Sequence, residues 1–423
     1  MQELLYLVHR IPYPPDKGDK IRSYHLLKHL SQRYRVHLGT FIDDEKDRSY
    51  LGKVRSLCGE TYFADLHPRA ARLRSLQGLF SGQPLTLPYY RDRNLQAWVS
   101  SVLETKPIRN ILVFSSAMAQ YVSHAGAARR IIDFVDIDSD KWRQYATTKT
   151  WPMSWIYRRE SRLLLGYERE IAKNFDSAAF VSQAEASLFK QLAPEAASKV
   201  TYFNNGVDAD YFSPQNIYCN PYPADRKILV FVGAMDYWAN IDAVNWFARS
   251  IFSAIRVQLP EVEFHIVGAR PTIEVMALAA LPGVTVTGSV PDVRPYLAHA
   301  SLAVAPLRIA RGIQNKVLEA MAMEKVVIAS PQAMEGLHAR PGQELFVAND
   351  ESDFSHRIIT LLQSQPNPAI GRAARARVLE DYNWKKSLRR IDAILSQPQV
   401  IYTNKDCSHT LQNQLESAGD DVA

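Results

Sequence analysis

The sequence predicts an α/β fold made of two doubly wound, Rossmann-like domains that face each other across a cleft. Three observations lead to this prediction. The chain has 423 residues, whereas one hydrophobic core usually serves a domain of ~100–200 residues. Short apolar runs alternate with amphipathic stretches along both halves of the chain, which is the pattern of strands that alternate with helices. A stretch with four Asn, three Pro and one Gly, residues 204–227, separates the two halves and has the composition of a linker.

The first half, residues 1–206, predicts the N-terminal domain. Its strand-like runs are LLYLV (4–8), RVHLGTF (35–41), RNILVF (109–114), RIIDFV (130–135), AAFVS (178–182) and VTYF (200–203). Between several of them, residues 18–34 and 155–175 place apolar side chains at three- and four-residue spacing, as helices do. Strand and helix in this alternation indicate a parallel sheet with helices on both faces.

The second half repeats the plan and predicts a C-terminal domain over residues 207–379. Its strand-like runs are ILVFVGA (228–234), EFHIVGA (263–269), VTVTG (284–288), SLAVAP (301–306) and KVVIAS (325–330), and its clearest helix covers 242–257. We expect a helix at about 380–396 to pack back on the first domain. From residue 397 to 423 the apolar periodicity fades, which predicts a flexible tail.

Composition excludes several classes of protein. Hydrophobic residues make up 47% and charged residues 22%, which is typical of a globular chain rather than a disordered one. Cys58, Cys219 and Cys407 stand far apart in the sequence, which favours a reducing compartment. No apolar run approaches the ~18–20 residues of a membrane span, so we expect a cytoplasmic protein. The net charge of +6 attracts anions, namely nucleic acid, lipid headgroups or a phosphorylated small molecule.

The stretch PLRIARGIQNKVLEAMAMEKVV (306–327) gathers the residue types that a phosphate site needs. Arg308, Arg311 and Gly312 fall in a loop that feeds a predicted helix, where unpaired N–H groups and the helix dipole favour an anion. Lys316, one turn into the helix, adds charge, and Glu319, a turn later, can accept both hydroxyls of a ribose. The alternative is that the arginines are solvated loop charges and that Lys316 and Glu319 form an i,i+3 surface pair.

Several motifs in a fixed order favour the phosphate interpretation. In the second half they are FVGAMDYWANIDAVNWF (231–247), FHIVGARP (264–271), VTVTGSVPDVRPYLAHASLAVAPL (284–307), PLRIARGIQNKVLEAMAMEKVVIAS (306–330), MEGL (334–337) and DYNWKKS (381–387). With them the chain resembles family 4 of the retaining glycosyltransferases, which have the two-domain GT-B fold. HRIPYPPDKGDKIRSYHLLKHL (9–30), DFVDIDSDKW (133–142) and NNGVDADYF (204–212) are similar to sugar transferases associated with the PEP-CTERM/exosortase exopolysaccharide systems.

This resemblance implies an activity. A sugar would pass, without a metal ion or another cofactor, from a nucleoside-diphosphate donor to a glycan or polyprenyl-linked acceptor, at the inner face of the cytoplasmic membrane where the acceptor is lipid-linked. The donor would contact Gly233, Asp236, Val290, Arg308, Gly312, Ile313, Gln314, Asn315, Lys316 and Glu319. In most of the wider family a glutamate lies eight residues before the one that matches Glu319. Here that position is Arg311, so the role of the first glutamate is not carried over.

The N-terminal half supplies two further candidate sites. DIDSD (136–140) follows a predicted strand, so Asp136 and Asp138 should lie in the cleft. The resemblance makes them the candidate catalytic residues, facing the acceptor hydroxyl and the transferred sugar. Binding of Mg²⁺ or Mn²⁺ and capping of the next helix are the alternatives. Lys17, Gly18 and Lys20 precede or open a helix and suit a phosphate or the acceptor.

Basic amphipathic stretches and rival functions complete the predictions. Residues 67–80 and 151–162 combine arginines with Leu, Phe and Trp, which suits ordinary surface helices or contact with an anionic membrane. Nucleic acid is not favoured, because no recognised binding fold accompanies the charge. The rivals to a transferase are a non-catalytic sugar-nucleotide or glycan-binding protein and a sugar-nucleotide epimerase on the same fold.

Overall fold

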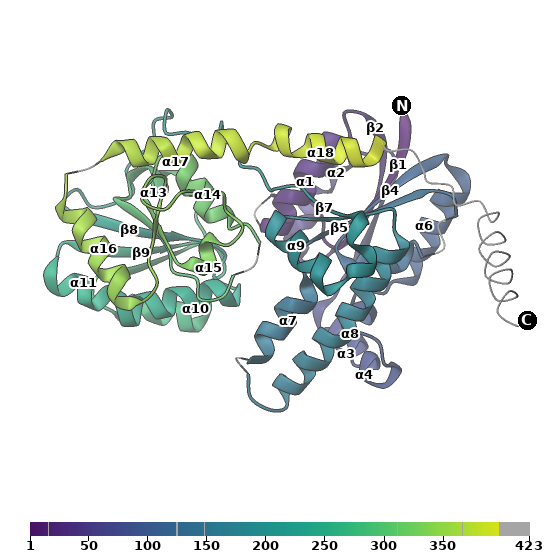
Figure 1. Cartoon of the computed structure of the whole chain (residues 1–423), viewed down its shortest axis with the longest axis horizontal. Helices are drawn as coiled ribbons and strands as arrows, with labels where there is room; N and C mark the ends of the chain where they lie inside the picture. Colours follow the sequence, from purple (N-terminus) through teal and green to yellow (C-terminus); the bar gives the residue numbers. More distant parts are fainter. Residues whose placement is uncertain (16, 124–125, 148, 311, 366, 397–423) are drawn as a thin grey trace, which may run out of the picture.

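The computed structural model describes residues 1–396 apart from 16, 124–125, 148, 311 and 366. Within this part the chain forms two α/β domains that lie side by side (Figure 1). The predicted fold class of two doubly wound domains is therefore confirmed. The predicted flexible tail, 397–423, falls outside the described residues. Among the described helices, none is both long and apolar enough to cross a bilayer.

In the described part of the N-terminal domain, seven parallel strands form a sheet in the order β3-β2-β1-β4-β5-β6-β7. The strands are β1 (Gln2–Val8), β2 (Tyr34–Ile42), β3 (Thr61–Asp65), β4 (Ile108–Phe114), β5 (Arg129–Val135), β6 (Ser177–Phe180) and β7 (Val200–Tyr202). Leu5 of β1 lies opposite His37 on one side and Ile111 on the other. The order reverses between β1 and β4, and doubly wound sheets bind ligands beyond the carboxyl ends of the strands at such a reversal.

The sequence prediction missed β3 and made the first helix too long. β3 is an edge strand in which Ala64 is the one buried side chain, so it lacks the continuous apolar run that marks a central strand. The helix expected over 18–34 ends at Leu30. Pairing of Tyr34 with Gln2 recruits the following residues into β2, because a buried sheet outweighs local helix propensity.

Helices cover both faces of this sheet (Figure 1). They are α1 (Gly18–Leu30), α2 (Leu51–Arg55), α3 (Pro68–Ser75), α4 (Gln77–Ser81), α5 (Thr86–Tyr89), α6 (Arg93–Thr105), α7 (Asp138–Thr147), α8 (Met153–Asn174) and α9 (Gln183–Leu192). Short 3₁₀ turns occur at Glu45–Tyr50, Ser116–Tyr121 and Pro194–Lys199. α1 follows β1 and α7 follows β5, so both helices begin at the carboxyl edge of the sheet.

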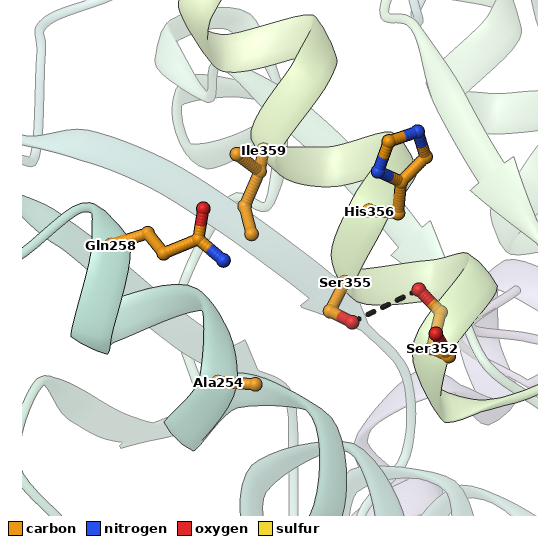
Figure 2. A pocket seen from close by; sticks show the side chains of 6 residues that line it. All are labelled: Ala254, Gln258, Ser352, Ser355, His356 and Ile359. Carbon is orange, nitrogen blue, oxygen red and sulfur yellow. Dashed lines mark hydrogen bonds between the residues drawn. The ribbon is translucent and has the colours of Figure 1, made fainter.

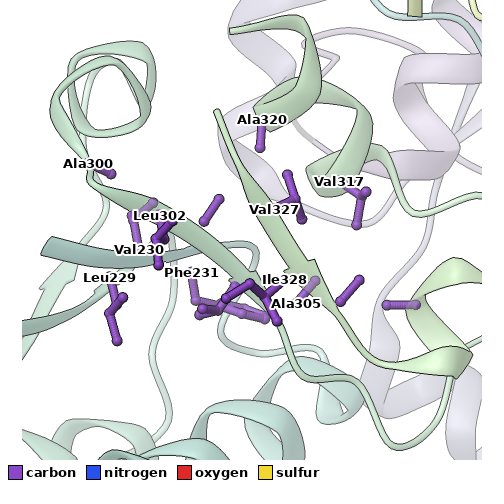
Figure 3. Packing of buried hydrophobic residues seen from close by; sticks show 14 of the residues in the cluster. Leu229, Val230, Phe231, Ala300, Leu302, Ala305, Val317, Ala320, Val327 and Ile328 are labelled. Carbon is purple, nitrogen blue, oxygen red and sulfur yellow. The ribbon is translucent and has the colours of Figure 1, made fainter. Parts of the chain in front are cut away.

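The described C-terminal domain contains six parallel strands in the order β10-β9-β8-β11-β12-β13. They are β8 (Lys227–Val232), β9 (Val262–Val267), β10 (Val284–Gly288), β11 (Leu302–Ala305), β12 (Val327–Ala329) and β13 (Phe346–Val347). Figure 3 shows Val317 and Ala320 beside Val327 of β12, within the cluster that holds Phe231 and Ile328. The prediction missed β13, because a strand of two residues carries no readable alternation.

The helices of this domain are α10 (Trp238–Trp246), α11 (Phe252–Gln258), α12 (Ile273–Met276), α13 (Arg294–His299), α14 (Asn315–Ala322), α15 (Pro331–Met334), α16 (Glu351–Gln363) and α17 (Pro368–Asp381). A 3₁₀ turn covers Ala277–Ala280. The helix expected over 242–257 begins at Trp238 and is interrupted by a π-turn at Phe247–Ile251. Apolar spacing does not reveal such a turn, since a π-turn adds one residue without ending the helix.

The final described helix, α18 (Trp384–Ser396), returns to the N-terminal domain (Figure 1). Ile391 and Leu388 share a buried cluster with Leu26 and Leu27 of α1. The ring of Trp384 stacks on that of His25 at 4.4 Å. The chain therefore crosses between the domains twice, at residues 204–207 and again between α17 and α18.

We predict that Ile391→Ala destabilises the N-terminal domain by about 2–5 kcal/mol, because it leaves a cavity between α18 and α1. Chemical unfolding followed by tryptophan fluorescence measures the change. Leu379→Ala on α17 is the control, since Leu379 is 47% exposed and its truncation should change stability little. Equal effects of the two substitutions would show that α18 does not support this core.

Candidate functional site

Two loops of the C-terminal domain meet where its strand order reverses. β8 and β11 are neighbours, so the loop after β8, which starts at Gly233, adjoins the loop that leads from β11 to α14. Gly233 donates its N–H to Val267 O, and a Cβ on Gly268 would lie 1.7 Å from Gly233 O. This close backbone approach packs the loop after β8 against the loop after β9, at the carboxyl edge of the sheet where doubly wound folds bind ligands.

The N-terminal end of α14, together with the loop that leads into it, contains the residues that the sequence predicted for a diphosphate. We call this region the mouth of α14. Gly312 has a left-handed φ of 65°, a conformation that costs glycine little. Gln314 is the N-cap residue and Asn315 is the first residue of the helix. The first N–H groups of a helix have no partner within it, so this end presents donors and the positive end of the dipole.

The charged groups of Lys316 and Glu319, near the N-terminal end of α14, have little access to solvent. The Lys316 ammonium donates to Asn240 Oδ1 and lies 4.7 Å from the centroid of the Phe231 ring. Burial lowers the pKa of Lys316 to about 8, although Glu319 opposes the shift. Burial also raises the pKa of Glu319 to about 7, against the charge of Lys316. A desolvated ammonium of this kind gains free energy when an anion approaches.

Asn240 is a site residue that the sequence analysis missed. Its side-chain amide donates to Ala234 O at 2.8 Å, while its Oδ1 accepts from Lys316. A Cβ on Gly233 would lie 2.8 Å from Asn240 Nδ2. Asn240 therefore joins the loop after β8 to α14. The sequence feature that could have identified Asn240 is its position at the start of a helix directly after a Gly-containing loop.

The remaining predicted donor residues are engaged by neighbouring side chains or packed against the core of this domain. The Arg308 guanidinium is paired with Asp242 of α10, with Nε 2.9 Å from Oδ2, and it would have to leave this pair to reach a diphosphate. Asp236 accepts from Arg270 at 2.7 Å. Val290 is half-buried against the core, and Ile313 is buried. Arg311 falls outside the described residues.

On the N-terminal side, Asp136 and Asp138 share one cation. Lys141 Nζ lies 2.9 Å from Asp136 Oδ2 and 3.1 Å from Asp138 Oδ1. Burial lowers the pKa of Lys141, but the two carboxylates outweigh it and hold the pKa well above its usual value. The ammonium thus stands where a metal ion would bridge the carboxylates. Within the described residues, no three His, Cys, Asp or Glu side chains gather as metal ligands.

Strain and buried carboxylates fix the position of Asp136. Val135, the last residue of β5, has φ 69°, which is a rare conformation for a β-branched residue and one that recurs at functional sites. Ile137 N donates to Glu185 Oε2 at 2.9 Å. Ser139 donates through both its N–H and its hydroxyl to buried Glu168. Burial, with a contribution from Asp138, raises the pKa of Glu168 to about 8.

The two domains meet at Asp136 and Gly312. A Cβ on Gly312 would lie 2.2 Å from Asp136 Oδ1, so the loop that feeds α14 touches the candidate catalytic carboxylate. Asp136 Oδ1 is buried and has no hydrogen-bond partner in the described part of the structure. The structure therefore brings together two sets of residues that lie 176 positions apart in the sequence.

A second contact places two helix N-termini opposite each other. Asn205 Nδ2 donates to Asn315 Oδ1 at 3.3 Å, which leaves the Asn315 amide nitrogen on the other side. A Cβ on Gly18, the first residue of α1, would lie 3.9 Å from that nitrogen. The positive ends of α1 and α14 thus converge on one place, and an anion between them would satisfy both.

Lys17 and Lys20 have different environments. Lys17 is the residue before α1, next to this convergence. Lys20 Nζ lies 2.7 Å from Asp47 Oδ2 in a buried ion pair. Lys20 is therefore directed to Asp47 in this structure rather than to the place where the two helices converge, because a buried ammonium is held by the carboxylate that compensates its desolvation.

Comparisons with known proteins agree with this architecture. Solved structures similar to most of the chain include sucrose-phosphate synthase from Thermosynechococcus elongatus, with 18% identity, a TM-score of 0.68 and coverage of 93% of this chain and 98% of that one. WaaG, a glycosyltransferase involved in lipopolysaccharide biosynthesis, has 13% identity, a TM-score of 0.65 and coverage of 93% and 100%. The chain has the GT-B fold. A third GT-B neighbour, HepE of Anabaena in complex with UDP and glucose, has 16% identity, a TM-score of 0.64 and coverage of 94% and 100%.

The sequence itself matches a glycosyltransferase family model over part of its length. Residues 226–364 match the model described as glycosyl transferases group 1, and they include Gly233, Lys316 and Glu319. No curated protein matches the chain. The family match and the GT-B fold support glycosyl transfer as the activity.

A hollow of about 240 Å³ lies on another part of the C-terminal domain. Figure 2 shows that its lining comes from α11 and α16, with Gln258 and Ile359 on either side and Ser355 bonded to Ser352 O. Neither helix carries a residue of the predicted site. The hollow is therefore not the donor site of the GT-B fold.

We predict that Gly312→Ala separates the domains, because the new Cβ would collide with Asp136 Oδ1. Gly342→Ala is the matched control, since Gly342 also has a left-handed φ, 79°, but a Cβ there meets nothing within 4 Å. Both substitutions carry a backbone cost of about 1–2 kcal/mol. Only Gly312→Ala should increase the radius of gyration in small-angle X-ray scattering. Indistinguishable scattering from the two variants would contradict the contact.

Proposed function

We propose that this protein is a retaining glycosyltransferase that moves a sugar from a nucleoside-diphosphate donor to a glycan or lipid-linked acceptor in exopolysaccharide synthesis, without a metal ion. One observation carries the proposal. Gly312, in the loop that leads into α14 and its Lys316, lies directly against Asp136 of the other domain. Donor phosphates at the helix mouth would therefore place the transferred sugar beside a carboxylate that has a free oxygen.

The diphosphate is the ligand that this electrostatic arrangement fits best. Two helix N-termini and the ammonium of Lys316 present positive charge, which Glu319 compensates in part. Such preorganised donors stabilise the charge that develops on a departing diphosphate more than they stabilise the bound donor, which lowers the barrier to transfer. Glu319, one turn further along α14, is placed to accept the hydroxyls of the donor ribose.

Asp136 is proposed to act on the sugar side of the reaction. Its Oδ2 is occupied by Lys141, while its Oδ1 is unpaired in the described structure and can accept a hydrogen bond from a sugar or acceptor hydroxyl. Lys141 compensates part of the charge of this carboxylate. The acceptor hydroxyl would attack the face of the sugar from which the diphosphate departs. This attack needs no strong base, because the departing diphosphate can take the proton of the hydroxyl.

A uridine diphosphate sugar is the donor to test first. Solved HepE structures of the same fold contain UDP, UDP with glucose, or UDP-glucose. We propose the same nucleotide here, with GDP- and TDP-sugars as the comparison. The lipid-linked acceptor would place the protein at the inner face of the cytoplasmic membrane.

The test of function is nucleotide release by purified protein. A transferase releases nucleoside diphosphate slowly with water and faster with a polyprenyl-linked glycan acceptor. Conversion of the sugar without release would identify an epimerase. Binding without either reaction would identify a non-catalytic protein, and both results would overturn the proposal.

We predict that Glu319→Ala weakens donor binding by about 10–100-fold, which corresponds to the loss of charged hydrogen bonds worth about 1.5–3 kcal/mol. Isothermal titration calorimetry with the UDP-sugar measures the dissociation constant. Glu319→Gln should lose less, since it keeps one acceptor oxygen. Glu274→Ala is the control, because Glu274 is an exposed residue of α12 outside the predicted site. An unchanged dissociation constant in Glu319→Ala would exclude the ribose role.

We also predict that donor affinity falls as pH rises. Below the Lys316 pKa of about 8 the ammonium is charged before binding. Above it, the bound phosphate must draw a proton onto Lys316, so affinity should fall up to about tenfold for each pH unit until the pKa of the complex is reached. Lys316→Arg should flatten this profile, because a guanidinium stays charged. A flat profile in the unmodified protein would contradict the role of Lys316.

A further inference from the structure

A set of large apolar side chains projects into solvent from one edge of the N-terminal domain. Phe80 of α4 is 92% exposed, Trp151 before α8 is 81% exposed and Leu73 of α3 is 71% exposed. The same edge exposes three further side chains: Leu76, Met153 and Trp155. We name these six residues the apolar edge. Soluble proteins seldom leave aromatic and leucine side chains together in water, so such a patch marks a contact site.

The segments that carry the apolar edge are basic, and the one acidic residue within 66–91 and 141–162, Glu160, is buried. Residues 66–91 include four arginines and no Asp or Glu. Residues 141–159 include five Lys or Arg and no Asp or Glu. Arg69, Arg72, Lys149, Arg158 and Arg162 are exposed. The apolar side chains are therefore accompanied by positive charge of one sign, which is the complement of an anionic surface.

Tertiary contacts join the two segments into one surface. The Arg159 guanidinium of α8 donates to Gly78 O of α4 at 2.5 Å. The Glu160 carboxylate accepts from Leu85 N at 2.6 Å and from Thr86 N at 3.0 Å. Figure 1 shows α3, α4 and the turn between α7 and α8 at the same edge of the domain. Residues some 70 positions apart thus present a single basic and apolar edge.

We propose that the apolar edge docks the protein on an anionic lipid bilayer. Trp, Phe and Leu side chains enter the headgroup region, where the amphipathic ring of Trp is favoured, and the surrounding arginines are attracted to anionic headgroups. The observations favour a bilayer over a protein partner, because the exposed charge is of one sign and spread over several separate side chains. This inference rests on the function proposed above, because docking would bring the protein to the membrane that contains its lipid-linked acceptor.

The apolar edge is connected to the candidate site through one helix. α7 begins at Asp138, beside Lys141 and Asp136, and ends at Thr147, just before the turn that carries Trp151. A helix of ten residues is about 15 Å long. A membrane at the apolar edge would therefore lie about one short helix from the carboxylates, within reach of a sugar carried on a lipid diphosphate.

Vesicle sedimentation of the full chain tests the docking. We expect the protein to sediment with vesicles of equimolar phosphatidylglycerol and phosphatidylcholine, and to stay in solution with phosphatidylcholine alone. The double substitution Phe80→Ser and Trp151→Ser should reduce binding at least tenfold. Arg72→Glu with Arg158→Glu should reduce it by roughly fivefold or more for each site. Ile217→Ser with Ile273→Ser is the matched control, since both residues are over 90% exposed on the C-terminal domain.

Three outcomes would overturn the proposal. The unmodified protein could fail to bind anionic vesicles, the double substitution at Phe80 and Trp151 could bind as tightly as the unmodified protein, or that substitution could instead dissociate a dimer in size-exclusion chromatography. UDP binding by the same variants separates docking from function, because none of the changed residues belongs to the donor site. Loss of vesicle binding with unchanged UDP binding supports docking, whereas absence of UDP binding in every variant counts against the proposed function alone.

Discussion

The arrangement of the site depends on one buried ion pair, between Arg22 and Asp133. Both side chains are fully buried, and the guanidinium donates to both carboxylate oxygens. It also donates to Phe203 O and to Asn205 Oδ1, which leaves the Asn205 amide to reach Asn315 of the other domain. Arg22 thereby ties α1, β5 and the linker together. Such a pair specifies geometry, since removing either partner would leave a buried charge uncompensated.

Two lysines at the domain interface differ in how far neighbouring carboxylates compensate their charge. This difference is the reason for proposing a ligand beside only one of them. Lys141 is paired with Asp136 and Asp138, so its charge is already compensated on the N-terminal side. Lys316 is desolvated beside Asn240 and the face of Phe231, with Glu319 as its partial counter-charge. A bound anion would therefore gain little electrostatic stabilisation next to Lys141 and much more next to Lys316. The interface is therefore asymmetric, with the proposed phosphate site beside Lys316 on one side and the Asp136 carboxylate on the other.

Much of the fold could be read from the sequence, and the errors share a cause. The central strands are buried on both faces and read as continuous apolar runs, so they were found. β3 and β13 are edge strands, one half-exposed and one very short, and they carry no such run. The same limit applies to the charges. Lys20 and Arg308 fit a phosphate pattern by position, but Asp47 and Asp242 reach them from distant segments, and no local pattern records a partner that tertiary packing supplies.

By itself the sequence determined the two doubly wound domains, the helix that follows the loop at Gly312, and the residue types at its mouth, because hydrophobic periodicity and helix-start chemistry are local properties. Only the tertiary structure decided that this mouth faces Asp136 and Gly18, that Lys316 is desolvated, and that two basic segments join along one edge of the N-terminal domain. These features depend on how the sheets, the linker and α18 orient the domains. Orientation arises from contacts between residues far apart in the chain, which spacing along the chain does not encode.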